Sequence, residues 1–202
     1  MDDQILITVG REFGSGGHVI AKAIAERMGI RYCVRKLLDE MFEGDEKKIS
    51  ELAQYDEKLA IPFLHRRVRG HSSSPEENLA KLQFEYLRDL AEKGESMVLV
   101  GRCGEWLFRD YPNHVSIFVT AEEVDKVARV MDREGKTEIE ARSKMARHDK
   151  SRAKYHNTYS DRMWGMASTY DLCVNASRLG IEGTTDMLLS YIEKRREAFK
   201  CQ

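Results

Sequence analysis

The feature that most constrains this chain is a glycine-rich loop, residues 10–17, between a short apolar run and a helical pattern. The run at residues 5–9 is rich in β-branched side chains and predicts a strand buried on both faces, as in a parallel sheet. Apolar residues then recur at helical spacing over residues 18–28, and Gly29 is suited to end that helix. The loop is therefore expected to form the first strand-to-helix turn.

A glycine-rich turn at this position is suited to hold an anion. Glycine permits positive φ angles and a close approach of the backbone to a ligand. Several N–H groups then point inward at the positive end of a helix dipole, where a phosphate or sulfate is stabilised without a dedicated side chain. Because four of the eight loop residues are glycine, we favour an anion site over a simple connecting turn.

The rest of the chain alternates short apolar runs with helical patterns. This order predicts a parallel sheet with helices on both faces, which is a three-layer αβα arrangement. The charged, helical pattern of residues 35–76 predicts an inserted substrate-side subdomain, with a basic stretch at residues 66–69 and a mobile loop near residues 70–76. Further strands are expected at residues 30–34, 96–100, 114–119 and 172–174, and further helices from Ser74 to Lys93, after Thr120 as N-cap, and over 137–157 and 181–198.

Composition narrows the classes of function. The formal net charge is −1, from 33 basic and 34 acidic side chains, so no whole-molecule field would steer a nucleic acid. The four cysteines form no CxxC pair and indicate reduced thiols, without clustered zinc ligands. No apolar run approaches the roughly 20 residues of a membrane span, and no signal-peptide pattern is present. We expect a soluble cytoplasmic protein that binds neither nucleic acid nor membrane.

The loop departs from the phosphate-binding signature G-x-x-x-x-G-K-[ST]. In that signature the lysine reaches the β- and γ-phosphates, and the hydroxyl holds Mg²⁺. Aligned on its glycines, the loop has Gly17 at the lysine position and His18 at the hydroxyl position. Arg11 and His18 are the local candidates for the missing positive charge, Arg11 through bidentate contact and His18 when protonated or as a neutral donor.

Four stretches, in order along the chain, resemble the cytidylate kinase-like family of the nucleoside monophosphate kinases. They are TVGREFGSGG at residues 8–17, VLVGRCG at 98–104, DKSRAKY at 149–155 followed by Trp164 and Gly165, and YDLCVNAS at 170–177. The resemblance implies a P-loop fold with a five-stranded parallel sheet, ATP as donor, Mg²⁺, and a CMP-like nucleoside monophosphate as acceptor. It implies one domain, residues 1–202, with a core of residues 1–34, 77–136 and 166–202, an acceptor-side insert at 35–76 and an arginine-bearing lid at about 137–165.

The resemblance also assigns roles to single residues. Arg102 falls on an arginine that grips the acceptor phosphate, although the acid beside that arginine in cytidylate kinases is absent at Val100 and Gly101. Arg152 falls on a lid arginine that closes over the transferring phosphoryl group, and Asp149 is spaced to pair with it. With Arg11, these arginines are our candidates for catalysis. The donor-phosphate loop falls on Gly14, Ser15, Gly16 and Gly17.

Three functions remain open from the residues alone. The first is a phosphotransferase from ATP to a nucleotide-like acceptor. The second is a nucleotide- or phosphate-binding module without kinase chemistry, because the lysine, the hydroxyl and the acid are missing. The third is a transferase for another anionic group, such as sulfate. Two further groups of residues have a bland interpretation. The acids nearest the loop, Glu12, Asp39 and Glu40, are not spaced as metal ligands. Core packing or a lid hinge is favoured over base stacking for four aromatic residues, Trp164, Tyr155, Tyr159 and Tyr170.

Overall fold

A five-stranded, wholly parallel sheet forms the centre of the fold, with strand order β2-β5-β1-β6-β7. The structure, a computed structural model, describes residues 4–34, 37–42, 45–53, 67–68, 71–72 and 74–200. The central strand β1 pairs through Leu6 with Met97 of β5 and with His114 of β6. The expected five-stranded parallel sheet is confirmed. Its strands are β1 (Leu6–Arg11), β2 (Arg31–Cys33), β5 (Met97–Val100), β6 (His114–Thr120) and β7 (Leu172–Asn175).

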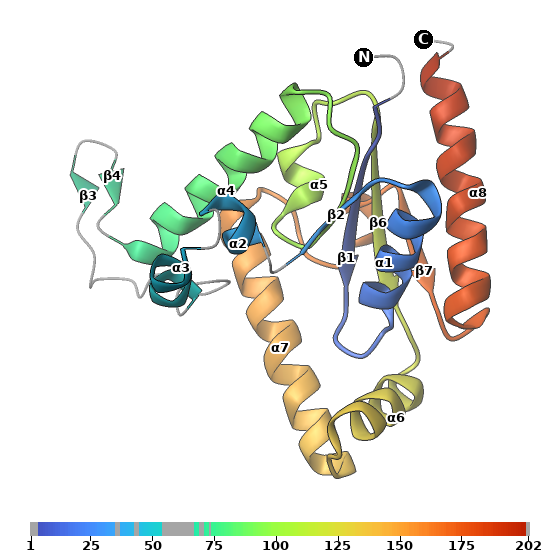
Figure 1. Ribbon diagram of the computed structural model, residues 1–202. Coiled ribbons are helices and arrows are strands. Elements are labelled where there is room, and N and C mark those ends of the chain that lie inside the picture. Colours follow the sequence, from blue (N-terminus) through green and yellow to red (C-terminus); the bar gives the residue numbers. More distant parts are fainter. Residues whose placement is uncertain are drawn as a thin grey trace.

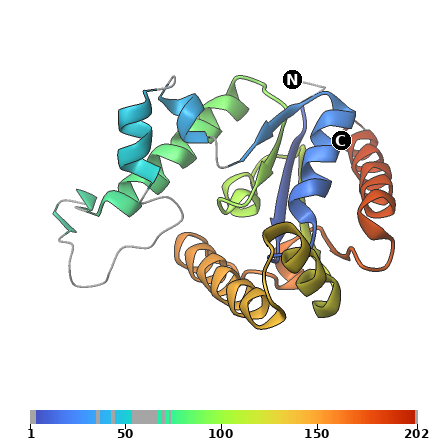
Figure 2. The ribbon, with the colours of Figure 1, turned by 60° about the horizontal axis from the view of Figure 1, so that its bottom comes forward.

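Helices cover both faces of this sheet, which confirms the three-layer prediction (Figure 1). One face carries α1 (Gly17–Met28) and α8 (Gly180–Lys200), which Figure 2 shows side by side. The other face carries α4 (Pro75–Glu92) and the short α5 (Gly104–Leu107). Because side chains alternate along a strand, Ile7 and Val9 of β1 pack on the α1 and α8 side, whereas Leu6 packs on the α4 and α5 side.

Local signals in the sequence explain most helix boundaries. The Ser74 hydroxyl caps α4 by accepting the Glu77 N–H at 3.3 Å, and α1 ends at Gly29 in the left-handed conformation. The expected cap at Thr120 was wrong, because α6 (Glu123–Glu134) begins after Glu122. Thr120 instead ends β6, and its hydroxyl donates to the Glu12 carboxylate at 2.5 Å.

The expected insert, where the structure describes it, lies beside α4 (Figure 1). It contains α2 (Leu37–Met41), α3 (Glu46–Ala53) and two antiparallel strands, β3 (Arg67–Val68) and β4 (His71–Ser72), that the helical pattern did not anticipate. The expected loop at residues 70–76 contains β4 and the start of α4, and residues 70 and 73 lie outside the described residues. Residues 66 and 69 of the basic stretch lie outside them as well.

Two helices lie across the carboxyl ends of the strands, below the sheet in Figure 1. They are α6 and α7 (Glu138–Tyr159), and α7 falls within the residues expected to form the lid. Thr137 and Glu140 form a reciprocal capping box at the start of α7. A 3-10 helix, η1 (Ala167–Thr169), leads from this region back to β7. Across the described ranges, no helix has the length and apolar character that a membrane span requires.

Candidate functional site

The glycine-rich loop joins β1 to α1 at the carboxyl edge of the sheet. Gly14 and Gly16 have φ angles of 82° and 86°, in the left-handed region that favours glycine. A Cβ atom on Gly14 would lie 2.8 Å from the Lys126 carbonyl oxygen, and one on Gly16 would lie 2.1 Å from Ile181 Cδ1. Glycine is therefore required here both by the turn and by the packing of α6 and α8 against the loop backbone.

The loop leaves backbone donors for a ligand. Within the described part of the chain, the N–H groups of Gly14, Gly16 and His18 have no acceptor. The Gly17 N–H is held by Ser15 Oγ at 3.3 Å, and that hydroxyl donates to the Glu12 carbonyl oxygen at 2.9 Å. Unpaired N–H groups at the N-terminus of a helix form a site for phosphate or another anion. The loop meets this requirement without the lysine of the standard signature.

The positive charge beside the loop comes from arginine rather than from His18. Burial lowers the pKa of His18, and the positive charge of Arg11 lowers it further, so the imidazole is neutral at pH 7. The His18 Nδ1 atom lies 2.9 Å from the Tyr32 hydroxyl. Arg11 reaches across to the end of β5, where a Cβ atom on Gly101 would lie 2.6 Å from its Nη1. Arg11 thus brings a permanent cation next to the loop.

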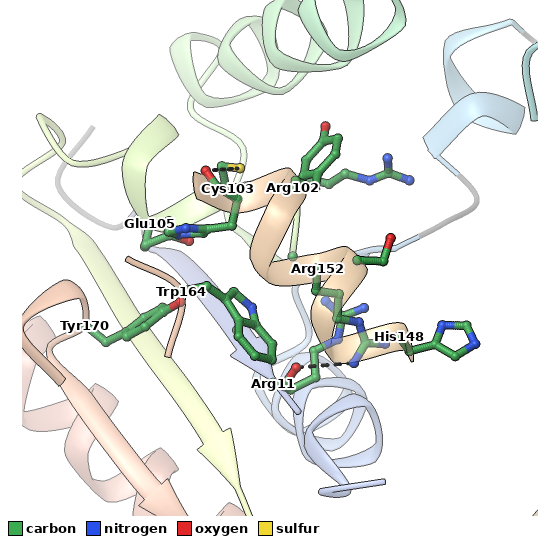
Figure 3. A pocket seen from close by; sticks show the side chains of 13 residues that line it. Arg11, Arg102, Cys103, Glu105, His148, Arg152, Trp164 and Tyr170 are labelled. Atoms are coloured by element: carbon green, nitrogen blue, oxygen red, sulfur yellow. Dashed lines mark hydrogen bonds and ion pairs between the residues drawn. The ribbon is translucent and has the colours of Figure 1, made fainter. Parts of the chain in front are cut away.

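A pocket lies between the carboxyl ends of β1 and β5 and the helix α7 (Figure 3). Three arginines that were candidates on separate grounds, Arg11, Arg102 and Arg152, all line it. Arg152 Nη1 donates to the Arg11 carbonyl oxygen at 3.3 Å, the link drawn between them in Figure 3. The complete lining is Gly10, Arg11, Gly101, Arg102, Cys103, Glu105, His148, Ser151, Arg152, Tyr155, His156, Trp164 and Tyr170.

Arg102 sits in an unusual turn after β5. Gly101, Arg102 and Cys103 have φ angles of 80°, 57° and 51°, so three successive residues are left-handed. Each residue with a side chain in this region costs about 1–2 kcal/mol, and such strain gathers at functional sites. The Arg102 side chain is only 4% exposed and donates from Nη1 to Gln83 Oε1 at 3.0 Å. The turn therefore directs Arg102 toward α4, on the side of the expected insert.

Helix α7 is docked directly on the glycine-rich loop. The Phe13 ring stacks on His148 with 4.6 Å between centroids, and the Phe13 N–H donates to Asp149 Oδ1 at 2.7 Å. Arg152 lies 3.5 Å from Asp149, which confirms the expected i,i+3 pair. Burial raises the pKa of Asp149, against the opposing effects of the Phe13 N–H and the Arg152 charge. The loop and α7 thus form one contact surface.

A buried acid–imidazole pair completes the pocket wall. Glu105 Oε1 lies 2.5 Å from His156 Nε2, and both side chains are 5% exposed. Sequence reasoning missed both residues, because the short α5 gave no periodic signal and 51 positions separate the partners. No acid stands at Val100 or Gly101, the positions just before Arg102, but Glu105 follows Arg102 by three residues and lines the same pocket.

The residues around the loop do not form a fitting site for Mg²⁺. The Glu12 carboxylate already accepts from the Thr120 hydroxyl and from Lys126 Nζ, the latter at 2.7 Å. His18 offers nitrogen where Mg²⁺ prefers oxygen, and Glu40 lies 3.9 Å from Arg31 in an ion pair away from the loop. Among the described residues, no group of three or more His, Cys, Asp or Glu side chains is placed to hold a metal ion.

The aromatic residues near the lid pack as well as line the pocket. Tyr155 and Tyr159 belong to the core on the α4 side, with 4.7 Å between their ring centroids. Trp164 and Tyr170 pack against Phe118, at centroid distances of 5.2 Å and 5.0 Å. These contacts agree with packing, which was the favoured interpretation, whereas a stacking role for Tyr155, Trp164 and Tyr170 in the pocket stays untested.

Three features define a P-loop kinase fold: the parallel sheet, the glycine-rich loop after its central strand, and the helices across its carboxyl edge. A solved shikimate kinase from Bacteroides thetaiotaomicron shares this fold, with a TM-score of 0.56 and 14% identity over 94% of this chain and 98% of that one. The chain belongs to the cytidylate kinase-like family, whose pattern matches residues 6–178. The resemblance drawn from the four sequence stretches is therefore confirmed.

Individual relatives agree with this membership. The cytidylate kinase of Archaeoglobus fulgidus is 24% identical over 195 residues, covering 94% of this chain and 96% of that protein. The cytidylate kinase of Pyrococcus horikoshii is 26% identical over 193 residues, covering 95% and 90%. A solved but uncharacterized protein from Eubacterium ventriosum is 36% identical, with a TM-score of 0.74 over 94% of this chain and 99% of that one. Family and fold together support a nucleotide kinase-like function.

Proposed function

We propose that this protein transfers the γ-phosphoryl group of ATP to a nucleoside monophosphate, with a CMP-like acceptor. The observation that carries the proposal is the convergence of Arg11, Arg102 and Arg152 on one pocket beside a loop with unpaired N–H groups. Phosphoryl transfer depends mainly on positioning and on positive charge around the transferring group, and this pocket supplies both. The archaeal relatives described as cytidylate kinases support the same choice of acceptor.

The residues divide the reaction between them. The N–H groups of the loop at Gly14, Gly16 and His18 hold the donor phosphates, and Arg11 supplies the charge that the standard lysine would bring. Arg102, directed toward α4, holds the acceptor phosphate. Arg152 faces the transferring group from α7. An oxygen of the acceptor phosphate bonds to the γ-phosphorus as the bond to the β–γ bridging oxygen breaks, which leaves ADP and a nucleoside diphosphate.

The decisive experiment measures ADP formation with ATP, Mg²⁺ and a panel of nucleoside monophosphates. We expect acceptor-dependent ADP, highest with a pyrimidine monophosphate. Arg102→Ala should lower kcat/KM for the acceptor about 10- to 100-fold, because a charge-assisted hydrogen bond contributes about 1.5–3 kcal/mol. Arg88→Ala, an exposed arginine on α4, is the matched control and should leave the rate unchanged.

A second candidate is a nucleotide-binding protein without turnover. The absence of a loop lysine and the neutral state of His18 favour it, because the loop then has less positive charge than a standard P-loop. In that case ATP raises the melting temperature while no acceptor produces ADP above background. That result would overturn the proposed kinase activity.

A further inference from the structure

The Glu105–His156 pair lies in the pocket wall but has no part in the reaction proposed above. It connects α5 to α7, two elements that otherwise meet the pocket from different sides. A second hydrogen bond lies beside the pair. The Cys103 thiol of the strained turn donates to the His156 carbonyl oxygen, with 4.0 Å between sulfur and oxygen. The turn that carries Arg102 is thus tied to α7 by a side chain and by a backbone group of the same histidine.

Both ring nitrogens of His156 have partners. Nε2 faces Glu105, and Nδ1 lies 3.2 Å from both Ser160 Oγ and Asn157 Oδ1. Asn157 Oδ1 also accepts the Trp164 N–H at 2.9 Å, which fixes the segment after α7. A ring held on both sides is suited to orient its surroundings and leaves no nitrogen for a substrate. His156 therefore acts on the pocket through the elements that it holds.

The spacing along α7 shows what His156 controls. Arg152 precedes it by four residues and so lies one turn away on the same face of the helix. Asp149 precedes Arg152 by three residues, so it lies one turn further toward the start of α7, where its carboxylate accepts the Phe13 N–H of the glycine-rich loop. A shift of α7 at His156 would move Arg152 and Asp149 together relative to the loop. Displacements of about 1 Å at such sites are enough to reduce rates about 100-fold.

We propose that Glu105 and His156 are a positioning pair, which fixes α7 against the Arg102 turn and thereby sets Arg152 at its working distance from the loop. The catalytic consequence of this inference rests on the proposed function, whereas its structural consequence does not. The pair is a positioning device because neither residue needs to touch the reacting atoms.

The ionisation of the pair gives the proposal a pH signature. Burial opposes the charge on His156, but the hydrogen bond and the charge of Glu105 outweigh it, so the pKa of His156 is raised above its usual value. The imidazolium–carboxylate pair is therefore lost as the pH rises through that raised pKa, because His156 then gives up its proton. Other titratable or charged groups face the pair from every neighbouring element. They include Arg102 and Cys103 of the turn, His114 of β6, Arg152, Tyr155 and Tyr159 of α7, Arg162 after it, and Tyr170 before β7.

The test compares His156→Ala, His156→Gln and the control His114→Gln. Glutamine can still donate to Glu105 but does not titrate. His114 is also a buried histidine and lies near Glu105, but its Nε2 atom lies 2.8 Å from Thr8 Oγ1 of β1, so it does not link α5 to α7. We expect His156→Ala to lower kcat at least about tenfold, a loss of about 1.4 kcal/mol, with a smaller change in KM for ATP. His156→Gln should regain most of kcat and lose the alkaline fall, and His114→Gln should keep both.

A readout without turnover separates this inference from the proposed function. In a Trp106→Phe background, the fluorescence of Trp164 reports on the segment tied to His156 through Asn157. Inorganic tripolyphosphate is the probe for the loop. We expect His156→Ala to change the Trp164 emission and weaken tripolyphosphate binding, with His156→Gln and His114→Gln close to wild type. This pattern supports the pair even if no acceptor is phosphorylated.

Two results would overturn the proposal. One is a folded His156→Ala protein, measured well below its melting temperature, with wild-type Trp164 emission and tripolyphosphate affinity. The other is a His156→Gln protein whose kcat falls with rising pH as steeply as that of the wild type. If His156→Ala does not fold, Glu105→Gln takes its place. A shift of the alkaline fall to lower pH in that variant supports the pair, because His156 then lacks the carboxylate that raises its pKa, and an unchanged fall refutes it.

Discussion

Gly16 illustrates how one residue serves both the loop and the core. Its φ angle is 86°, and an added Cβ would lie 2.1 Å from Ile181 Cδ1 of α8. Gly16→Ala should destabilise the fold by about 2–4 kcal/mol, the sum of left-handed strain of about 1–2 kcal/mol and local overpacking. Urea unfolding of Gly135→Ala is the control, because Gly135 has φ 62° and nothing within 4 Å of its Cβ position. Equal losses in the two variants would contradict the packing argument.

The sequence allowed some site residues to be predicted and concealed others. Arg11, Arg102 and Arg152 were candidates from a loop, a strand end and a lid segment, and all three line one pocket, although their roles remain predictions. Glu105 and His156 were not found, because a buried pair depends on contacts between residues far apart in the chain. A single sequence shows neither burial nor such contacts, so the acid near Arg102 could not be recognised.

At the level of elements, the capping box of α7 stabilises the first turn of that helix. The Thr137 hydroxyl accepts the Glu140 N–H, and the Glu140 carboxylate accepts the Thr137 N–H at 2.9 Å. Thr137→Ala should lower the free energy of unfolding by about 1 kcal/mol, the usual loss for an N-cap side chain. Thr158→Ala, an exposed site in the last turns of α7, should have almost no effect. The measurement compares the denaturant midpoints of the two variants with that of the wild type. Similar losses of stability in Thr137→Ala and Thr158→Ala would refute the capping role.

Elements with strong local signals were predicted well from the sequence, and short ones were not. The capped α4 and the apolar strands β1 and β6 follow from patterns within a few residues. The four-residue α5 has no room for a helical period, and its boundaries depend on packing under α4. Thr120 was misread as a cap because its hydroxyl has a partner, Glu12, that lies 108 positions away.

For the whole molecule, one histidine should control part of the acid stability. His114 is buried, and burial lowers its pKa to about 4, so the folded protein keeps it neutral at pH values where the unfolded chain is protonated. Stability should therefore fall as the pH drops from about 6.5 to about 4, by roughly 3 kcal/mol from this group. His114→Gln should show a shallower decline in unfolding experiments over this range. If the free energy of unfolding of His114→Gln falls with pH as steeply as that of the wild type, His114 does not contribute to acid denaturation.

The place of β1 at the centre of the sheet has a consequence for biosynthesis. Its partners begin at Met97 and His114, so about half of the chain must leave the ribosome before β1 can pair. Pairing across such separations makes sheet formation slow compared with helix formation. The contacts of the glycine-rich loop form later still, because Ile181 of α8 packs against Gly16. The packing around the loop is therefore complete only after the start of the last helix has been synthesised.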